Sequence, residues 1–263
     1  MPSKPAAQEP RLYRGVSAAE RRAGRRERLL EAGLELFGTR GYADTSIRAV
    51  SAQAALNSRY FYESFSSRED LLYHVYRRIV RDLAMAVIAA TAQAETVEEQ
   101  ARAGLRAGWT ALTEDRRKAR IIALEVVGVS ERLERVRRDN RHAFANIVVQ
   151  NALSFAGDPS RLLMDPTLTA RSLMAAVVDM QVDWLNGDVD ASVDEIVEHF
   201  TRLFTAVAYG SVRDLSVMGL GAGRGRSAKR AAAKRPAAKR PAVKRPAAKA
   251  PSAAKRSAAK RPG

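Results

Sequence analysis

The stretch GYADTSIRAVSAQAALNSRYFYESFSSREDLL, residues 41–72, holds two short helical patterns in close succession. The first begins at Thr45 or Ser46, whose hydroxyls suit a helix N-cap, and the second begins at Asn57, which suits the same position. Two short helices joined by a turn of three or four residues make a helix-turn-helix. Apolar residues recur at helical spacing within both patterns, at Ile47, Val50, Ala54 and Phe61.

Helical periodicity also dominates on both sides of this stretch, and no alternating run is long enough to favour a β-sheet. Three hydroxyl residues, Ser67, Thr96 and Ser192, each precede an acidic residue by three positions, the spacing of a capping box. We therefore predict an all-α body. Its further helices are expected at about 18–39, 67–92, 96–112, 116–127, 130–155 and 165–185, and from 192 onward.

The charge is divided unevenly along the chain. The net charge is +16, yet residues 221–263 hold fifteen Lys or Arg and no acidic residue. The first 220 residues carry 30 Lys or Arg against all 29 Asp and Glu, a net charge of +1. The excess charge therefore belongs to the tail and indicates a polyanionic partner.

Residues 25–73 resemble the signature of the TetR family of one-component transcriptional regulators. The resemblance implies a DNA-binding domain of three helices, followed by a helical bundle for ligand binding and dimerisation. It also implies a homodimer on a double-stranded operator, most simply a repressor that a small effector releases. The residues in the family's register are Gly41, Tyr42, Thr45, Ser46, Ala54, Tyr62, Phe65, Arg68 and Leu71.

The same resemblance assigns DNA contacts to individual residues. The recognition helix is expected at residues 58–64, with Arg59 able to pair with a guanine edge. Tyr62 and Arg68 are expected on phosphates, and Thr45 and Ser46 on the DNA backbone. The positions expected to face the groove are Arg48, Ser58, Arg59, Tyr60 and Ser64.

Ala55 departs from the family pattern, because glycine is usual at this position of the turn. An alanine adopts a positive φ only at a cost of about 1 kcal/mol. We therefore expect either a reshaped or a strained turn at Ala55.

The predicted bundle offers candidate residues for a ligand pocket and for dimerisation. Apolar residues indicate a hydrophobic effector such as a lipid or an acyl thioester, and each of them also suits an ordinary core. The pocket candidates are Met85, Arg106, Trp109, Phe144, Met174 and Trp184. The last two helices, expected as antiparallel neighbours, carry apolar faces that suit either a core or a four-helix dimer interface. These dimer candidates are Val177, Met180, Phe200, Leu203, Phe204 and Val207.

The tail repeats Lys-Arg pairs with a five-residue period, often followed by proline, between residues 229 and 245. Regular proline forbids a stable helix and the segment lacks apolar bulk, so we expect a disordered chain. It resembles the tails of linker-histone-like and nucleoid proteins, and is expected to bind phosphate backbones without choosing sequence. The alternative function is an architectural DNA-binding protein dominated by this tail.

Several other classes of function lack the residues that they need. The chain has no cysteine, and its three histidines, His74, His142 and His199, lie on separate predicted helices with no paired metal ligand three or four residues further along the chain. No catalytic motif is present, so we expect neither an enzyme nor a metal or cofactor.

No segment suits a signal peptide or a membrane span, so we expect a cytoplasmic, nucleoid-associated protein without membrane insertion. The expected organisation is an N-terminal arm (1–17), a DNA-binding domain (18–66), a ligand-binding and dimerisation domain (67–216) and a disordered basic tail (217–263).

Overall fold

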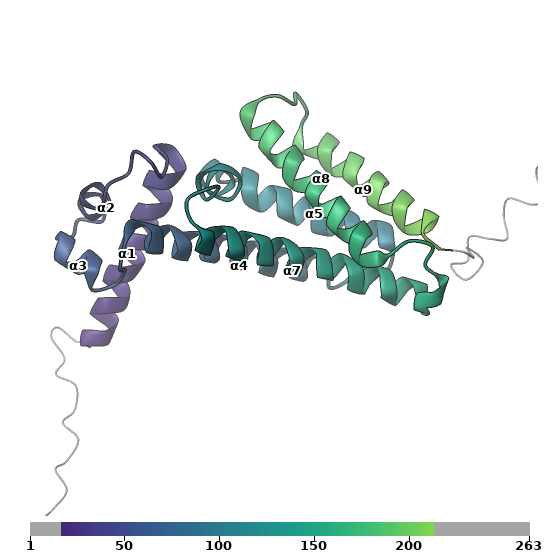
Figure 1. Cartoon of the computed structure of the whole chain (residues 1–263), viewed down its shortest axis with the longest axis horizontal. Coiled ribbons are helices and arrows are strands. Elements are labelled where there is room, and N and C mark those ends of the chain that lie inside the picture. The colour runs from purple at the N-terminus through teal and green to yellow at the C-terminus, as the bar shows by residue number, and fades with distance from the viewer. Residues whose placement is uncertain (1–16, 213–263) are drawn as a thin grey trace, which may run out of the picture. The chain divides into compact units, whose positions relative to one another are not determined.

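The computed structural model describes residues 17–212, and the expected basic tail and nearly all of the expected N-terminal arm lie outside this range. Within the described range the chain is helical and has no named β-strand, which confirms the all-α prediction (Figure 1). The elements are α1 (Ala18–Thr39), α2 (Ile47–Gln53), α3 (Ser58–Tyr62), α4 (Arg68–Thr91), α5 (Val97–Thr113), α6 (Arg116–Arg120), the π-helix η1 (Ile121–Glu125), α7 (Glu131–Ala156), the 3-10 helix η2 (Pro159–Arg161), α8 (Pro166–Asn186) and α9 (Val193–Gly210).

The helices begin where side chains satisfy their first backbone N–H groups. Thr96 and Ser192 form complete capping boxes with Glu99 and Glu195, as predicted. Ser17 forms a third box at the start of α1. The predicted starts of these helices are therefore correct because a short-range polar pattern specifies each of them.

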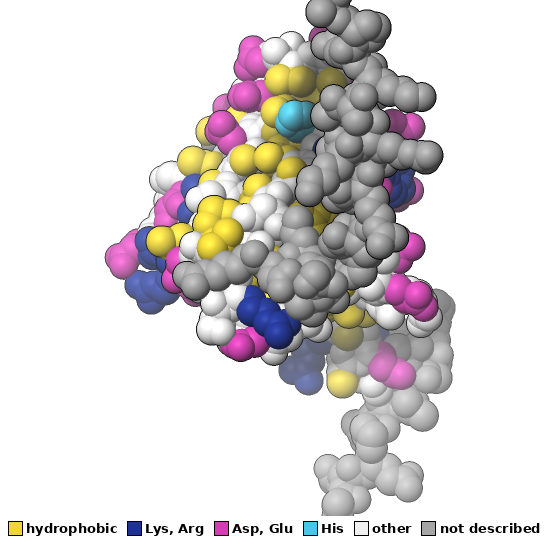
Figure 2. Space-filling model, turned by 90° about the vertical axis from the view of Figure 1, so that its right-hand side faces the viewer, with side chains coloured by type: hydrophobic (Ala, Val, Ile, Leu, Met, Phe, Trp, Pro, Cys, Tyr) yellow, Lys and Arg dark blue, Asp and Glu magenta, His cyan; other side chains and the backbone are white. Residues whose placement is uncertain are grey.

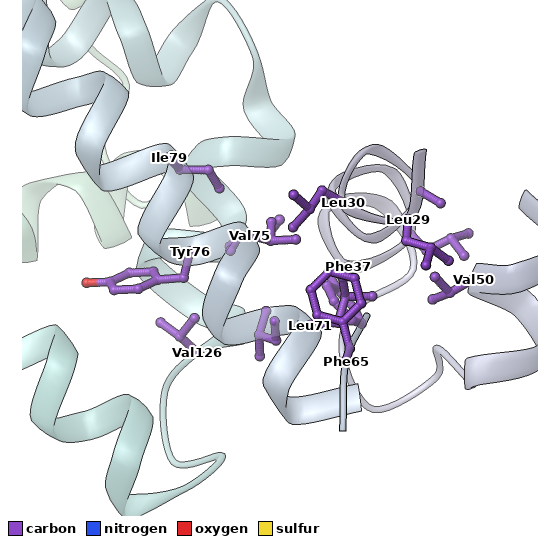
Figure 3. Packing of buried hydrophobic residues seen from close by; sticks show 14 of the residues in the cluster. Leu29, Leu30, Phe37, Val50, Phe65, Leu71, Val75, Tyr76, Ile79 and Val126 are labelled. Atoms are coloured by element: carbon purple, nitrogen blue, oxygen red, sulfur yellow. The ribbon is translucent and has the colours of Figure 1, made fainter. Parts of the chain in front are cut away.

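One continuous core joins α1–α3 to the first half of α4. Figure 3 shows Leu71 and Val75 of α4 pointing toward α1, where Leu30 and Phe37 lie. Tyr76 lies on the other side of α4 and extends the core toward η1 and α7. The position of α1–α3 relative to α4 is therefore fixed by buried apolar contacts.

A second, smaller core lies among α5, α8 and α9. The rings of Trp109 and Trp184 meet edge to face, with centroids 5.9 Å apart, beside the buried Phe200. The last two helices were expected to be neighbours along their length. Instead, α9 packs mainly on α5 and α8 packs mainly on α7, although apolar residues of both helices belong to this second core.

The segment expected as a single helix over residues 116–127 changes its winding. It begins as α6 and continues as the π-helix η1, in which Ile121 and Ala123 are buried. Single π-helical turns often occur at functional sites. Here the wider turn places Glu125 beside the loop that follows α1, where it bonds to Tyr42.

None of the helices within residues 17–212 is both long enough and apolar enough to cross a membrane.

Candidate nucleic-acid interface

The turn between α2 and α3 is built as the sequence predicts. Ser46 Oγ accepts a hydrogen bond from the Ala49 N–H at 3.1 Å, and Asn57 Oδ1 accepts one from the Arg59 N–H at 2.9 Å. Between these caps, Ala55 has a φ of 51°, the one positive value at a non-glycine position among the described residues. The turn thus keeps the left-handed conformation with a strained alanine.

Buried aromatic residues fix the inner side of α3. Phe61 is completely buried, and its ring lies 5.8 Å from that of Phe65. Val50 of α2 belongs to the same core (Figure 3). Because α3 has only five residues, this single buried phenylalanine determines which of its side chains face outward.

The outer side of α3 presents polar and aromatic groups. The Arg59 side chain is 86% exposed, and Tyr62 is 62% exposed. Tyr60 is partly exposed, and Ser58 is half-buried at the start of the helix. Ser46 and Arg48 are exposed at the start of α2, whereas Ser64 is half-buried and lies just beyond the end of α3. This surface therefore offers a guanidinium, hydroxyls and aromatic faces to a ligand.

A cluster of three charged residues and one ring ties α3 to α1. The Arg25 guanidinium lies 4.5 Å from the centre of the Tyr60 ring and donates to Glu63 at 3.2 Å. Glu63 also lies 3.8 Å from Arg59. Sequence reasoning missed Glu63, although its spacing of four residues from Arg59 was a usable signal for an ion pair.

Thr45 has a structural role, and the expected DNA contact of its side chain is corrected. The residue is completely buried, and its hydroxyl donates to the carbonyl oxygen of Gly41 at 2.7 Å. A buried hydroxyl that already donates to the backbone cannot meet a phosphate.

Arg68, expected on a phosphate, also makes contacts within the chain. Its guanidinium donates to the carbonyl oxygens of Thr45 at 2.7 Å and Ala43 at 3.2 Å. It also stacks over the ring of Tyr42 at 4.2 Å. Arg68 therefore fastens the start of α4 to the loop that precedes α2.

A second group of polar contacts, the α1–α6 clasp, joins the end of α1 and its following loop to α6 and η1. Arg117 pairs with Glu35 at 2.5 Å and with Asp115 at 2.8 Å, and Glu125 accepts a hydrogen bond from the Tyr42 N–H at 2.7 Å. Hydrogen bonds from Arg117 lower the pKa of Asp115. The clasp links the helix-turn-helix region to the bundle at a point distant in sequence.

Gly38 permits this close approach. A Cβ atom at Gly38 would lie 2.3 Å from the Cβ and 2.7 Å from the Cα of Arg117. Since one of these atoms is backbone, only glycine fits between α1 and α6 in this arrangement.

The start of α4 is tied to the start of α7 in a similar way. Asp70 pairs with Arg132 at 3.0 Å, and Ser130 donates to Glu69 at 2.7 Å. Burial opposes ionisation of Asp70, but hydrogen bonds from the Ser66 N–H and from Arg132 outweigh it and lower the pKa. A displacement of α7 would therefore act on the end of α4 nearest to α1–α3.

Residues 29–75 match the family model of bacterial regulatory proteins, tetR family. This stretch, which contains the helix-turn-helix, is therefore similar to the DNA-binding region of that family. No curated protein matches the chain.

Solved structures of TetR family regulators share this fold. The fatty acid degradation regulator FadR of Bacillus halodurans aligns with a TM-score of 0.62 at 14% identity, covering 68% of this chain and 94% of that one. FadR of Bacillus subtilis, solved in complex with stearoyl-CoA, gives 0.61 at 16% identity, covering 69% and 98%. A putative TetR-family regulator from Syntrophomonas wolfei gives 0.60 at 18% identity, covering 72% and 96%. The likeness extends beyond the helix-turn-helix into the bundle.

The expected pocket residues do not converge in this structure. Met85 is 62% exposed, and Trp109 and Trp184 pack into the second core. Arg106 pairs with Asp194 at 2.6 Å, and Met174 is half-buried on α8. The expectation that these residues line one cavity is therefore wrong, because most of them already pack or pair within the chain.

A cavity of about 220 Å³ does lie between α4 and α7, and Phe144 is the one expected pocket residue in its wall. Its polar groups come from Arg77, Arg81 and Asn140. Its apolar wall consists of Val80, Ala84, Ala143, Phe144 and Ile147. The cavity therefore combines cationic and apolar groups.

Two of the expected dimer residues are buried within their own chain. Val177 is 5% exposed and Phe200 is 2% exposed in the second core, so neither can form a dimer contact. Met180, Leu203, Phe204 and Val207 are half-buried, and the first three pack against the same core.

Within residues 17–212, no three His, Asp or Glu side chains gather as a metal site.

Proposed function

We propose that this chain is a repressor of the TetR type that binds a two-fold symmetric operator as a homodimer, with α3 in the major groove. The observation that carries the proposal is that α3 has one buried and one exposed face, so that the buried Phe61 directs Arg59 outward. A short helix that presents such side chains above a fixed core suits direct contact with base edges.

The proposed DNA contacts follow from which side chains of α2 and α3 are exposed. Arg59 reads a guanine, and Ser58, Tyr60 and Arg48 contact neighbouring bases or sugars. Tyr62 binds a phosphate, which its high exposure supports. Ser46 and Ser64 complete the proposed interface at the ends of α2 and α3.

Selection of duplexes from a random pool, followed by footprinting, tests the proposal. A dimer is expected to protect two half-sites about 34–36 Å apart, one turn of DNA. Uniform coating that grows with duplex length would instead favour the architectural alternative. The family match already favours the regulator.

We further propose that the cavity between α4 and α7 holds the anionic end of an amphipathic effector, such as an acyl thioester. Arg77, Arg81 and Asn140 suit a phosphate or carboxylate, and Phe144 and Ile147 suit a neighbouring apolar segment. Its volume is below the range of about 300–1,000 Å³ for drug-sized ligands, so it suits part of such a molecule. The stearoyl-CoA of the Bacillus subtilis relative belongs to this chemical class.

In this proposal the effector releases DNA by shifting α4. Because α4 carries both the cavity and the contacts of Arg68, its displacement alters the spacing of the two α3 helices in the dimer. The protein then acts as a repressor, because the dimer without effector is the form whose two α3 helices have the spacing of the operator half-sites.

Operator release by stearoyl-CoA, stearate and coenzyme A, measured by fluorescence anisotropy, tests this proposal. Stearoyl-CoA is expected to be the most effective of the three. Ala84→Leu narrows the cavity and should weaken the response, whereas Ala89→Leu at an exposed position of α4 is the matched control. An unchanged response in Ala84→Leu would contradict the assignment of the cavity.

The proposed dimer interface uses the outer faces of α8 and α9. Exposed apolar residues before and within α8 include Leu163 (54%), Met164 (43%) and Leu168 (66%). Figure 2 shows apolar side chains gathered in a band on one face of the molecule, flanked by acidic residues. Burial of such a surface against a second copy would stabilise a dimer.

Sedimentation analysis tests the interface. Leu168→Glu is expected to give a monomer, whereas Ile88→Glu, at a similarly exposed position of α4, should leave the dimer intact. A dimeric Leu168→Glu would place the interface elsewhere.

The basic tail lies outside the described residues and remains a proposal drawn from sequence. It adds DNA affinity without choosing sites. If about five tail charges bind phosphates, raising salt from about 50 to 200 mM should cost the full chain two to three more decades of affinity than a chain ending at residue 220. Equal salt dependence of the two chains would contradict this role.

A further inference from the structure

Glu63 is an unexpected residue at the end of a DNA-binding helix. Residues 46–62 contain no acidic side chain, so Glu63 is the first negative charge met along α2 and α3. It is partly exposed, at 36% of its side-chain surface. A carboxylate near the phosphates of bound DNA is repelled by them, which makes Glu63 unfavourable for general DNA affinity.

Stability of the fold gives only a weak reason for this residue. Its partners are Arg25, at 3.2 Å, and Arg59, at 3.8 Å, and the Arg59 side chain is almost entirely exposed. An exposed ion pair such as Glu63–Arg59 contributes about 0–1 kcal/mol to folding, and the Arg25 side chain of the other pair is 20% exposed. The residue therefore lowers DNA affinity without a comparable gain in stability.

Both partners of Glu63 lie at the proposed reading surface. Arg59 projects from α3, and Arg25 lies over the ring of Tyr60. A bare phosphate must compete with Glu63 for each of them. A guanine of the operator competes more strongly than a phosphate does, since a bidentate contact between arginine and guanine contributes about 1–3 kcal/mol of discrimination.

We propose that Glu63 is a specificity-determining residue: by holding Arg25 and Arg59 in ion pairs, it lowers affinity for non-operator DNA more than affinity for the operator. The inference rests on the proposed function, because it requires α3 to contact DNA. It also gives the strongly cationic chain a means of limiting binding to arbitrary sites, since the basic tail favours all DNA equally.

The test compares Glu63→Gln with the wild-type full chain on two duplexes of equal length, the operator selected by the wild type and a shuffled sequence. At about 0.1 M salt, freeing one cation should raise affinity for the shuffled duplex about five- to tenfold. The slope of log affinity against log salt for this duplex should steepen by about one. Operator affinity should rise less than about twofold, because guanine already draws Arg59 from Glu63.

Glu98→Gln is the matched control, because it removes one acidic charge from an i,i+4 pair with arginine on α5. It should leave both affinities unchanged. Glu63→Ala provides a second variant that lacks the side chain altogether and should behave as Glu63→Gln does. Circular dichroism and thermal unfolding would establish that each variant is folded.

Three results would overturn the inference: an unchanged shuffled-duplex affinity, an equal gain on both duplexes, or a loss confined to the operator. The last would mean that Glu63 itself contacts a base. Failure of the proposed function looks different, because a wild type that selects no preferred duplex contradicts the operator proposal whatever Glu63 does.

Discussion

The two apolar cores of this chain differ in how completely their residues are buried and in how firmly they hold the surrounding helices. The core around α1–α4 joins completely buried residues such as Leu29, Phe37 and Phe61, and it extends to η1 and α7. The core around Trp109 is smaller and is bordered by half-buried residues, including Leu203 and Phe204. Buried side chains therefore determine the orientation of α3 strictly, whereas the second core leaves some of its apolar surface partly exposed.

Replacing a phenylalanine by alanine should show the largest difference in stability loss between the two cores. Phe61→Ala is expected to cost about 3–5 kcal/mol, because it removes the one fully buried side chain of α3. Phe204→Ala, at a half-buried position of α9, should cost about 1–2 kcal/mol. Urea unfolding at one protein concentration measures both, and equal losses would contradict the difference between the cores.

A methyl group at Gly38 should disturb the α1–α6 clasp. Gly38→Ala is expected to cost about 1–3 kcal/mol, because the added Cβ would overlap the backbone of Arg117. Gly24→Ala on the same helix meets no atom within 4 Å and should stabilise α1 by up to about 1 kcal/mol. Thermal unfolding measures both. Equal effects of the two variants would show that α1 and α6 are not closely packed.

Acid should weaken the clasp before it affects the apolar cores. The pKa of Asp115 is lowered by hydrogen bonds from Arg117, so the folded state holds fewer protons than the unfolded state. The stabilisation is present above the unfolded pKa of about 3.9 and is lost as pH falls through the lower folded value. Asp115→Asn should lower the free energy of unfolding by about 0.5–1.5 kcal/mol at neutral pH. It should also make this free energy fall less steeply below about pH 4. Urea unfolding from pH 7 to 2 measures it, and an unchanged pH profile would contradict this role.

The turn at Ala55 should show the smallest effect. Ala55→Gly relieves the left-handed conformation but increases the freedom of the unfolded chain, so stability should change by about 0–1 kcal/mol, toward stabilisation. Ala52→Gly, at an exposed position in α2, should destabilise by about 0.5–1 kcal/mol. A clear loss of stability in Ala55→Gly would contradict the strained turn.

Local signals explain how much of the fold was predictable. The helix starts at Ser46, Asn57, Thr96 and Ser192 follow from side chains that bond to backbone N–H groups a few residues away. The left-handed turn at Ala55 follows from its place in the motif. These features depend on neighbours in sequence, so a single sequence contains the necessary information.

The remaining features depend on contacts between distant residues. The burial of Thr45, the engagement of Arg68 and the pairing of Arg25 with Glu63 arise only when the helices pack. The same is true of the second core, since α9 packs mainly on α5, which precedes it by about 80 residues. Periodicity identifies an apolar face but does not say which helix covers it.

The central claim is that Arg59, directed outward by the buried Phe61, reads a base of the operator. The most direct test measures the affinities of the wild type and Arg59→Ala for the selected operator and for every single base-pair variant of it. Arg59→Ala is expected to lose about 1–3 kcal/mol of discrimination at one base pair in each half-site and to keep the wild-type preference elsewhere. A uniform loss at all positions, or an unchanged preference at every one, would contradict it.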